Sequence, residues 1–116
     1  MKTIKIINTS KDYILGDKIT EAKSVVSRIK GLIGRKEIVA ETGLLIPKCG
    51  SIHTFFMSMA IDVIFLDIEL RIIKLVKRLE TNKLCSCWNA AYVLELPVGT
   101  VDKSGSEIGD RVEISK

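Results

Sequence analysis

The strongest constraint in this sequence is a pair of apolar runs, residues 61–67 and 70–76, that a very short connection separates. Ile, Val and Leu dominate both runs, and β-branched side chains suit the pleated surface of a strand. The connection, residues 67–70, has room only for a tight turn. The sequence therefore predicts a β-hairpin over residues 61–77.

Further short strands are predicted on both sides of this hairpin, because Gly, Pro, Asn and Asp separate several short apolar runs. The segment Thr20–Gly34 instead repeats apolar residues at helical spacing, which predicts a helix with Thr20 as its cap. A turn or single helical turn is predicted over 99–106. About eight strands with one or two short helices predict a mainly β fold, a compact β-sandwich or barrel-like single domain over residues 1–116. The additional strands are expected at 3–8, 13–19, 43–47, 51–56, 90–96 and 111–114.

The composition agrees with a small β-rich domain that has no membrane partner. Apolar residues make up 47% of the 116 residues, but only 5% are aromatic, so we expect a core of Ile, Leu and Val. No apolar stretch approaches the roughly 18 residues that a membrane span requires. The first residues lack the apolar centre of a signal peptide. We therefore expect a cytoplasmic protein.

Charge and cysteine content limit the possible partners. The net charge is +4, and residues 1–60 hold ten Lys and Arg against five Asp and Glu. These basic residues alternate with acidic and apolar ones, and no aromatic stacking platform accompanies them, so a nucleic acid is not expected. Three cysteines, an odd number, predict reduced thiols rather than a disulfide scaffold. Nothing in the sequence indicates an oligomeric state.

Chemically active residue types gather in segment 49–67. It contains the only histidine, His53, and a carboxylate, Asp62, that has apolar neighbours. Such a carboxylate must be hydrogen-bonded, paired or at an edge, because an isolated buried charge is very costly. One hypothesis is an enzyme in which His53 activates Cys49 or Cys85 as the nucleophile and Asp62 orients the imidazole.

A zinc site is a second hypothesis for the same region. Cys49, His53, Cys85 and Cys87 supply the thiolate and imidazole groups that suit zinc. However, Cys-x-Cys is an unusual spacing, and His53 and Cys85 lie more than thirty residues apart. The apolar setting favours a third interpretation, in which the thiols pack as small hydrophobes and the polar groups are structural anchors. No catalytic residue, metal ligand or cofactor is therefore predicted.

Binding is the function that these residues favour. Arg35, His53, Asp62 and Trp88 are the predicted lining of a pocket or groove. Their mixture of cationic, polar and aromatic groups suits a polar or anionic small molecule, or a peptide. The expected protein is thus a small non-catalytic binding or accessory domain.

Two of the nearby side chains also receive structural interpretations. Trp88 is predicted to close one end of a small core, with lining of a pocket as the alternative. Glu95 alternates with Leu94 and Leu96, which predicts that it is exposed. Arg35 is expected to form an ion pair with Glu95 or to meet an anionic group.

The order of several short motifs resembles that of the DUF192 family. The motifs are KGLIGR at 30–35, GLLI at 43–46, IHTFFM at 52–57, IDVIFLD at 61–67, YVLELPVG at 92–99 and GDRV at 109–112. The match extends from about residue 20 to the C-terminus. The resemblance implies a compact β-sandwich or barrel-like domain with a short helix near its start. The family has no assigned function, so the resemblance implies no catalytic residue.

Overall fold

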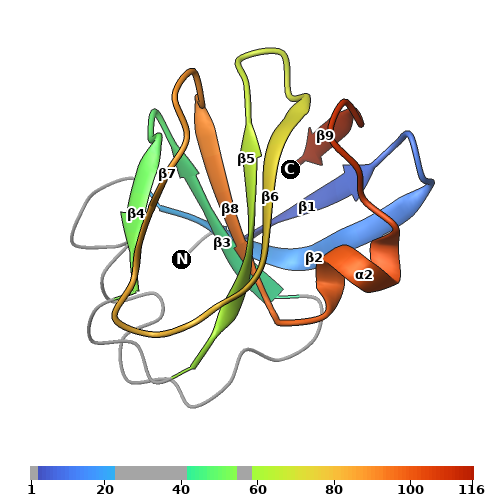
Figure 1. The fold of residues 1–116 in the computed structure, drawn as a ribbon. Coiled ribbons are helices and arrows are strands. Elements are labelled where there is room, and N and C mark those ends of the chain that lie inside the picture. Colours follow the sequence, from blue (N-terminus) through green and yellow to red (C-terminus); the bar gives the residue numbers. More distant parts are fainter. Residues whose placement is uncertain (1–2, 23–41, 55–58) are drawn as a thin grey trace.

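The computed structural model describes residues 3–22, 42–54 and 59–116, and this part of the chain is mostly strand (Figure 1). It contains nine strands and one short helix, named here by the labels of Figure 1. The elements are β1 (Thr3–Asn8), β2 (Tyr13–Glu21), β3 (Thr42–Pro47), β4 (Ser51–His53), β5 (Ile61–Leu66), β6 (Ile72–Leu79), β7 (Leu84–Ser86), β8 (Tyr92–Leu96), α2 (Thr100–Ser104) and β9 (Val112–Ser115).

Seven of these strands form one strongly curved, mixed sheet in the order β6-β5-β8-β3-β2-β1-β9. The pair β2–β3 is parallel, and the other neighbouring pairs are antiparallel. The edge strands β6 and β9 approach each other through an isolated bridge between Arg71 and Arg111. Beside this bridge, the N–H of Ile72 donates to the carbonyl of Asp110 at 2.9 Å. The fold is therefore barrel-like without being a closed barrel, and the predicted mainly β class is confirmed.

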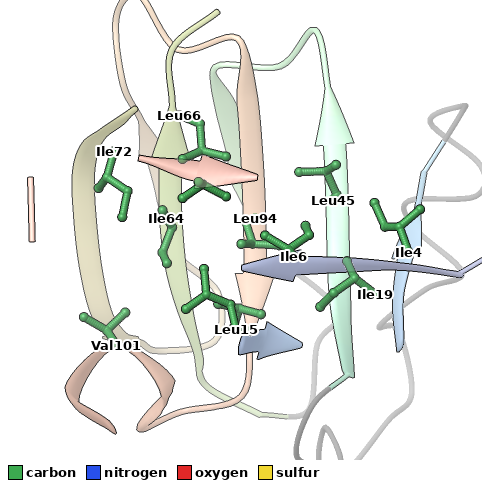
Figure 2. Close-up of a cluster of buried hydrophobic side chains, with 12 residues drawn as sticks. Ile4, Ile6, Leu15, Ile19, Leu45, Ile64, Leu66, Ile72, Leu94 and Val101 are labelled. Carbon is green, nitrogen blue, oxygen red and sulfur yellow. The ribbon is translucent and has the colours of Figure 1, made fainter. Parts of the chain in front are cut away.

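The concave side of the sheet holds a cluster of buried aliphatic side chains that we call the inner core (Figure 2). All seven strands of the sheet contribute to it, and α2 adds Val101. The expected core of Ile, Leu and Val is confirmed here, because its buried members are all of these three types. They are Ile4, Ile6, Leu15, Ile19, Leu45, Ile64, Leu66, Ile72, Leu94, Leu96, Val101 and Val112.

A second cluster, the outer core, lies on the opposite face of β3, β5 and β8. Side chains alternate along a strand, so each strand supplies both cores: Leu94 of β8 belongs to the inner core and Val93 to the outer. The buried members of the outer core are Ala22, Leu44, Ile46, Ile52, Ile61, Val63, Phe65 and Val93. Ile52 comes from β4, so a segment outside the seven-stranded sheet helps to cover this face.

The predicted hairpin is confirmed, whereas the predicted helix start is wrong. Strands β5 and β6 pair antiparallel, and the pairing extends to Leu79, two residues beyond the expected end. Thr20, however, lies in β2, where it pairs with Thr3 of β1 and Leu44 of β3. Sheet pairing on both sides has overridden the weak local preference of this threonine for a helix cap. The rest of the predicted helix, residues 23–34, lies outside the described residues.

Candidate binding surface

The segment that sequence reasoning singled out pairs with a strand far away in the chain. Strands β4 and β7 form a separate two-stranded antiparallel ribbon, shown at the left of Figure 1. Within it, Ile52 lies opposite Cys85 and His53 lies opposite Leu84. The ribbon therefore joins the predicted His53 region to the Cys85-x-Cys87 region.

One side of the ribbon packs against the protein. Ile52 is fully buried in the outer core, and Cys49, Cys85 and Cys87 are partly buried against it. The Cys49 Sγ donates to the Ser51 carbonyl at 3.0 Å. All three cysteines lie in the described segments and none forms a disulfide. The cysteines thus pack as small apolar groups, as expected, and the reduced state of their thiols stays a prediction.

The zinc hypothesis finds no geometric support. Its four candidate ligands, Cys49, His53, Cys85 and Cys87, all lie on or beside the ribbon within the described residues. Among those residues, no group of three or more His, Cys, Asp or Glu side chains is placed to hold a metal ion. The ribbon thus brings the cysteines and His53 into one region, but their side chains do not form a tetrahedral ligand set.

Asp62 acts as an anchor inside the fold. It is only 1% exposed. Its Oδ1 accepts the N–H of Arg78 in β6 at 2.9 Å, and its Oδ2 accepts the N–H groups of Gly99 at 3.1 Å and Val101 at 3.0 Å. Arg78 has a positive φ of 50°, so Asp62 holds an irregular point of β6 as well as the start of α2. Three backbone donors satisfy the buried charge, as its apolar surroundings require.

This arrangement removes one part of the enzyme hypothesis. An imidazole oriented by Asp62 would have to donate to its carboxylate, as in other acid–base pairs. All three hydrogen bonds of Asp62 instead come from backbone N–H groups. The described geometry therefore gives no catalytic triad of Cys49, His53 and Asp62.

Trp88 is 90% exposed, so the prediction that it belongs to the core is wrong. It follows β7 in a turn, where Asn89 has a positive φ of 74° and Ala90 donates its N–H to the carbonyl of Cys87 at 3.3 Å. The turn places Trp88 outside the outer core, although Cys87 beside it is packed there. Leu84, at the start of β7, is also exposed, at 71%.

Positive charge surrounds these two exposed apolar side chains. Lys48 and Lys83 are exposed, and the Nζ of Lys74 donates to the Ser86 carbonyl at 2.8 Å. Segments 48–54 and 83–91 contain no Asp or Glu. We call the exposed side chains of this region the ribbon surface, and they are Lys48, Ser51, Lys83, Leu84, Ser86, Trp88 and Asn89.

Sequence reasoning placed Thr54 in a family motif but assigned no role to this buried residue, which shapes one end of the surface. Thr54 accepts the N–H of Lys83 through its Oγ1 at 2.8 Å and donates the hydroxyl to the Glu80 carbonyl at 2.7 Å. Its backbone N–H also donates to the Lys83 carbonyl at 2.8 Å. Asn82 has a positive φ of 60° in this turn. Asn is a residue type that favours tight turns, so it is the signal for this turn in the sequence. Thr54 thereby fixes the turn that presents Lys83 and Leu84.

Glu95 is buried, at 3% exposure, so the prediction that it is exposed is wrong. It lies in β8 between Leu44 of β3 and Val63 of β5. Alternation separates exposed from buried residues only where one face of a sheet meets water, and here both faces are covered. Glu95 therefore places a carboxylate on the face of the outer core.

The four predicted binding residues are distributed as follows. His53 belongs to the ribbon, and Trp88 lies in the turn after it. Asp62 bonds to β6 and to the start of α2. Arg35 lies outside the described residues, so the convergence of all four on one pocket stays a prediction.

A curved mixed sheet with a packed ribbon defines a small β-rich domain, and solved structures share this fold. A protein of unknown function from Novosphingobium aromaticivorans superposes with a TM-score of 0.76 at 20% identity, over 95% of this chain and 82% of that one. A protein from Sinorhizobium meliloti described as a "putative transcription regulator" gives a TM-score of 0.78 at 22% identity, over 95% and 90% of the two chains.

The chain belongs to the DUF192 family, described as "Uncharacterized ACR", whose sequence model matches residues 6–114. The resemblance seen in the sequence is thus confirmed, and the match to the family begins at residue 6 instead of about residue 20. A UPF0127 protein of Pyrococcus horikoshii is 31% identical over 93% of this chain and 96% of its own length. One from Thermococcus sibiricus is 30% identical over 93% of this chain and 73% of its own. None of the helices in the described residues is both long and apolar enough to cross a membrane.

Proposed function

We propose that this protein is a non-catalytic binding module and that the ribbon surface is its contact site. The observation that carries this proposal is the exposure of Trp88, with Leu84 exposed on the same ribbon. Exposed Trp contributes nothing to the packing of the monomer. At interfaces, by contrast, buried Trp is among the side chains that contribute most to binding.

The charges of the ribbon surface favour a polar or anionic ligand, either a small molecule or a peptide. Lys48 and Lys83 of this surface supply two ammonium groups, and Lys74 of β6 adds a third through its bond to Ser86. The two segments of the surface contain no acid. An anionic ligand would be drawn to such a surface and oriented on it by charge complementarity. The anchoring of Asp62 by backbone donors favours binding over catalysis.

The cytoplasm remains our expected compartment for this activity. The ribbon carries thiols that pack without forming disulfides, which suits a reducing environment. Fractionation of cells that express a tagged chain tests this expectation, and recovery from a membrane or extracellular fraction would contradict it.

A direct test of binding uses the fluorescence of Trp88, which is the only tryptophan of the chain. An exposed indole emits at longer wavelength than a covered one, so a ligand seated on the ribbon surface shifts the emission to the blue. The probes are inorganic phosphate, citrate, an oligonucleotide, and peptides of acidic, neutral and basic composition. We expect at least one class to shift the emission and to raise the melting temperature, because a ligand that binds only the native state stabilises it.

The matched control separates the ribbon surface from other exposed apolar positions. Leu84→Ser removes an apolar contact from the ribbon surface, whereas Ile108→Ser alters an exposed isoleucine of the turn before β9. Binding should weaken in the first variant and stay unchanged in the second. If no class of probe changes the emission or the melting temperature, the ribbon surface is not a binding site.

A further inference from the structure

We infer that the ligand of the ribbon surface is an extended acidic segment of a partner protein. This inference rests on the proposed function and specifies its ligand. It follows from where the charges lie along the ribbon, from the length of the ribbon, and from the single aromatic side chain that it exposes.

The cations lie at both ends of the ribbon surface. Lys83 precedes β7, immediately before Leu84. Lys48 lies at the other end, where its N–H donates to the carbonyl of Ala91 at 2.7 Å, close in sequence to Trp88. Glu80, on the far side of the turn before Lys83, is the nearest acid along the chain. Each end of the ribbon surface thus attracts negative charge.

The length of the ribbon favours an extended ligand over a small anion. Five residue steps separate Lys83 from Trp88, and the strand β7 covers three of these residues. Because a strand rises by about 3.3 Å per residue, the two residues are at most about 16 Å apart. A phosphate or citrate ion can neutralise one end only. An extended peptide of about five residues covers the same distance and can place a carboxylate at each end. Trp88 and Leu84 then supply apolar contacts between the charges.

The shortage of exposed aromatic rings disfavours a single-stranded nucleic acid. Such ligands stack successive bases on several aromatic side chains. Among the residues that the structure describes, Phe65 is buried, and Tyr13 and Tyr92 pack against the inner core. Trp88 is the only strongly exposed ring there, so one apolar anchor flanked by lysines matches a peptide better.

Two contacts order the ribbon near its lysines before any ligand arrives. The ammonium of Lys74 is tied to Ser86, and the hydroxyl of Thr54 fixes the backbone of Lys83. A surface that is ordered in advance loses less conformational entropy on binding. The same contacts define where an acidic side chain would meet the ribbon.

The test titrates the full chain with an eight-residue peptide of alternating Glu and Val, and with the matching Lys and Val peptide. Trp88 emission and its protection from acrylamide report on coverage of the ribbon surface. We expect the acidic peptide to shift the emission to the blue and the basic peptide to leave it unchanged. Raising the salt to about 1 M, where the Debye length is about 3 Å, should remove most of the binding.

Charge reversal then locates the site. The double variant with Lys48→Glu and Lys83→Glu should lower the affinity for the acidic peptide about tenfold, because two close charge contacts become repulsive. The control pair, Lys5→Glu with Lys103→Glu, makes the same change at exposed positions of β1 and α2 and should leave affinity unchanged. If the double ribbon variant melts below the wild type, the single Lys83→Glu variant replaces it, with an expected loss of about threefold.

Each outcome bears on the inference. Equal weakening by both charge-reversal pairs, or binding of the basic peptide, would overturn an acidic ligand while leaving the ribbon surface as a binding site. A shift caused only by an oligonucleotide or only by citrate would overturn the peptide in the same way. A failure of every class of probe would overturn the proposed function together with this inference.

Discussion

The inner and outer cores share the same strands but differ in chemistry. The inner core takes its buried side chains from the seven strands of the sheet and α2, and all are Ile, Leu or Val. The outer core includes Phe65, has cysteines packed against it, and shares its face with the buried carboxylate of Glu95. Beyond it lies the ribbon, with Trp88 exposed. Both sides of the sheet thus hold buried polar groups, since the buried Asn8 shares one side of β1 with Ile4 and Ile6 of the inner core. Among the described residues, the packed thiols and the neighbouring exposed tryptophan belong to the outer side.

This difference indicates where substitutions should affect folding and where they should affect binding. Loss of a side chain from the inner core leaves a cavity among well-packed aliphatic groups, which is costly. Loss of a side chain from the ribbon surface leaves no cavity, because that side chain was already exposed, so it should change the free energy of unfolding little. Five measurements would test this division.

The largest loss of stability is expected for Leu94→Ala in the inner core. Leu94 is fully buried in β8 between β3 and β5. Removing its side chain should lower the free energy of unfolding by about 2–5 kcal/mol. Urea denaturation followed by circular dichroism measures this change. A loss below about 1 kcal/mol would mean that the inner core can collapse around the gap.

Asp62→Ala should lower the free energy of unfolding by about 1–3 kcal/mol, because it leaves three backbone N–H groups without their acceptor. These groups belong to Arg78, Gly99 and Val101. Asp62→Asn keeps one acceptor oxygen and should lose less. Chemical denaturation that finds no loss in the alanine variant would contradict the role of Asp62 as an anchor.

Gly43→Ala should destabilise the sheet more than Gly50→Ala destabilises the ribbon. A Cβ at residue 43 would come within 2.5 Å of the Glu95 carbonyl oxygen, whereas one at residue 50 would be 3.1 Å from the Cys87 carbonyl oxygen. We expect losses of about 1–3 kcal/mol at residue 43 and below about 1 kcal/mol at residue 50. Melting temperatures of the two variants would compare the sheet and the ribbon directly, and equal values would contradict this ranking.

A smaller effect is expected from acid, at the junction of β1 with the turn before β9. Burial alone would raise the pKa of Asp110, but hydrogen bonds from Asn8 and the Glu107 N–H, with the charge of Lys11, hold it below its ordinary value of 3.8. The charged form thus stabilises the fold fully above pH 3.8, and this contribution is lost as the pH falls through the lower folded-state pKa.

The variant Asp110→Asn tests that pH dependence. It removes the titrating group, so unfolding below pH 3.8 should depend less steeply on pH than in the wild type. Stability measured from pH 2 to pH 7 gives the two profiles, and identical acid limbs would show that Asp110 does not contribute.

The smallest effect on stability is expected for Trp88→Ala, despite the size of the side chain. An exposed side chain without buried contacts usually changes the free energy of unfolding by less than about 0.5 kcal/mol. The same variant should lose affinity for an acidic peptide, measured by the anisotropy of a labelled peptide. A large loss of stability would instead show that Trp88 is part of the packing.

The parts of the fold that form between residues close in sequence could be predicted from the sequence. The β5–β6 hairpin is local, because one turn joins two strands whose apolar runs are plain in the sequence. The β4–β7 ribbon could not be predicted in that way. Its strands are three residues each and lie some thirty residues apart, so no local pattern signals their pairing.

The burial of single polar and aromatic residues was harder to predict for a related reason. Glu95 follows the alternation of an exposed position, but the ribbon side of the sheet is covered as well as the concave side. The exposure of Trp88 follows from its place in the turn between β7 and β8. The anchoring of Asp62 could be anticipated from its apolar neighbours, although its partners in β6 and at the start of α2 could not.

The contact between Asn8 and the turn before β9 has a consequence for the time course of folding. The Nδ2 of Asn8 donates to Ser106 and Asp110, which follow it by 98 and 102 residues. A ribosome adds about 5–20 residues per second, so these partners are made about 5–20 s after Asn8. During that interval β1 can pair with β2, while the edge that later binds β9 has no neighbour. Completion of the sheet must therefore wait for almost the last residues of the domain, and pairing over such sequence separations is characteristic of slow folding.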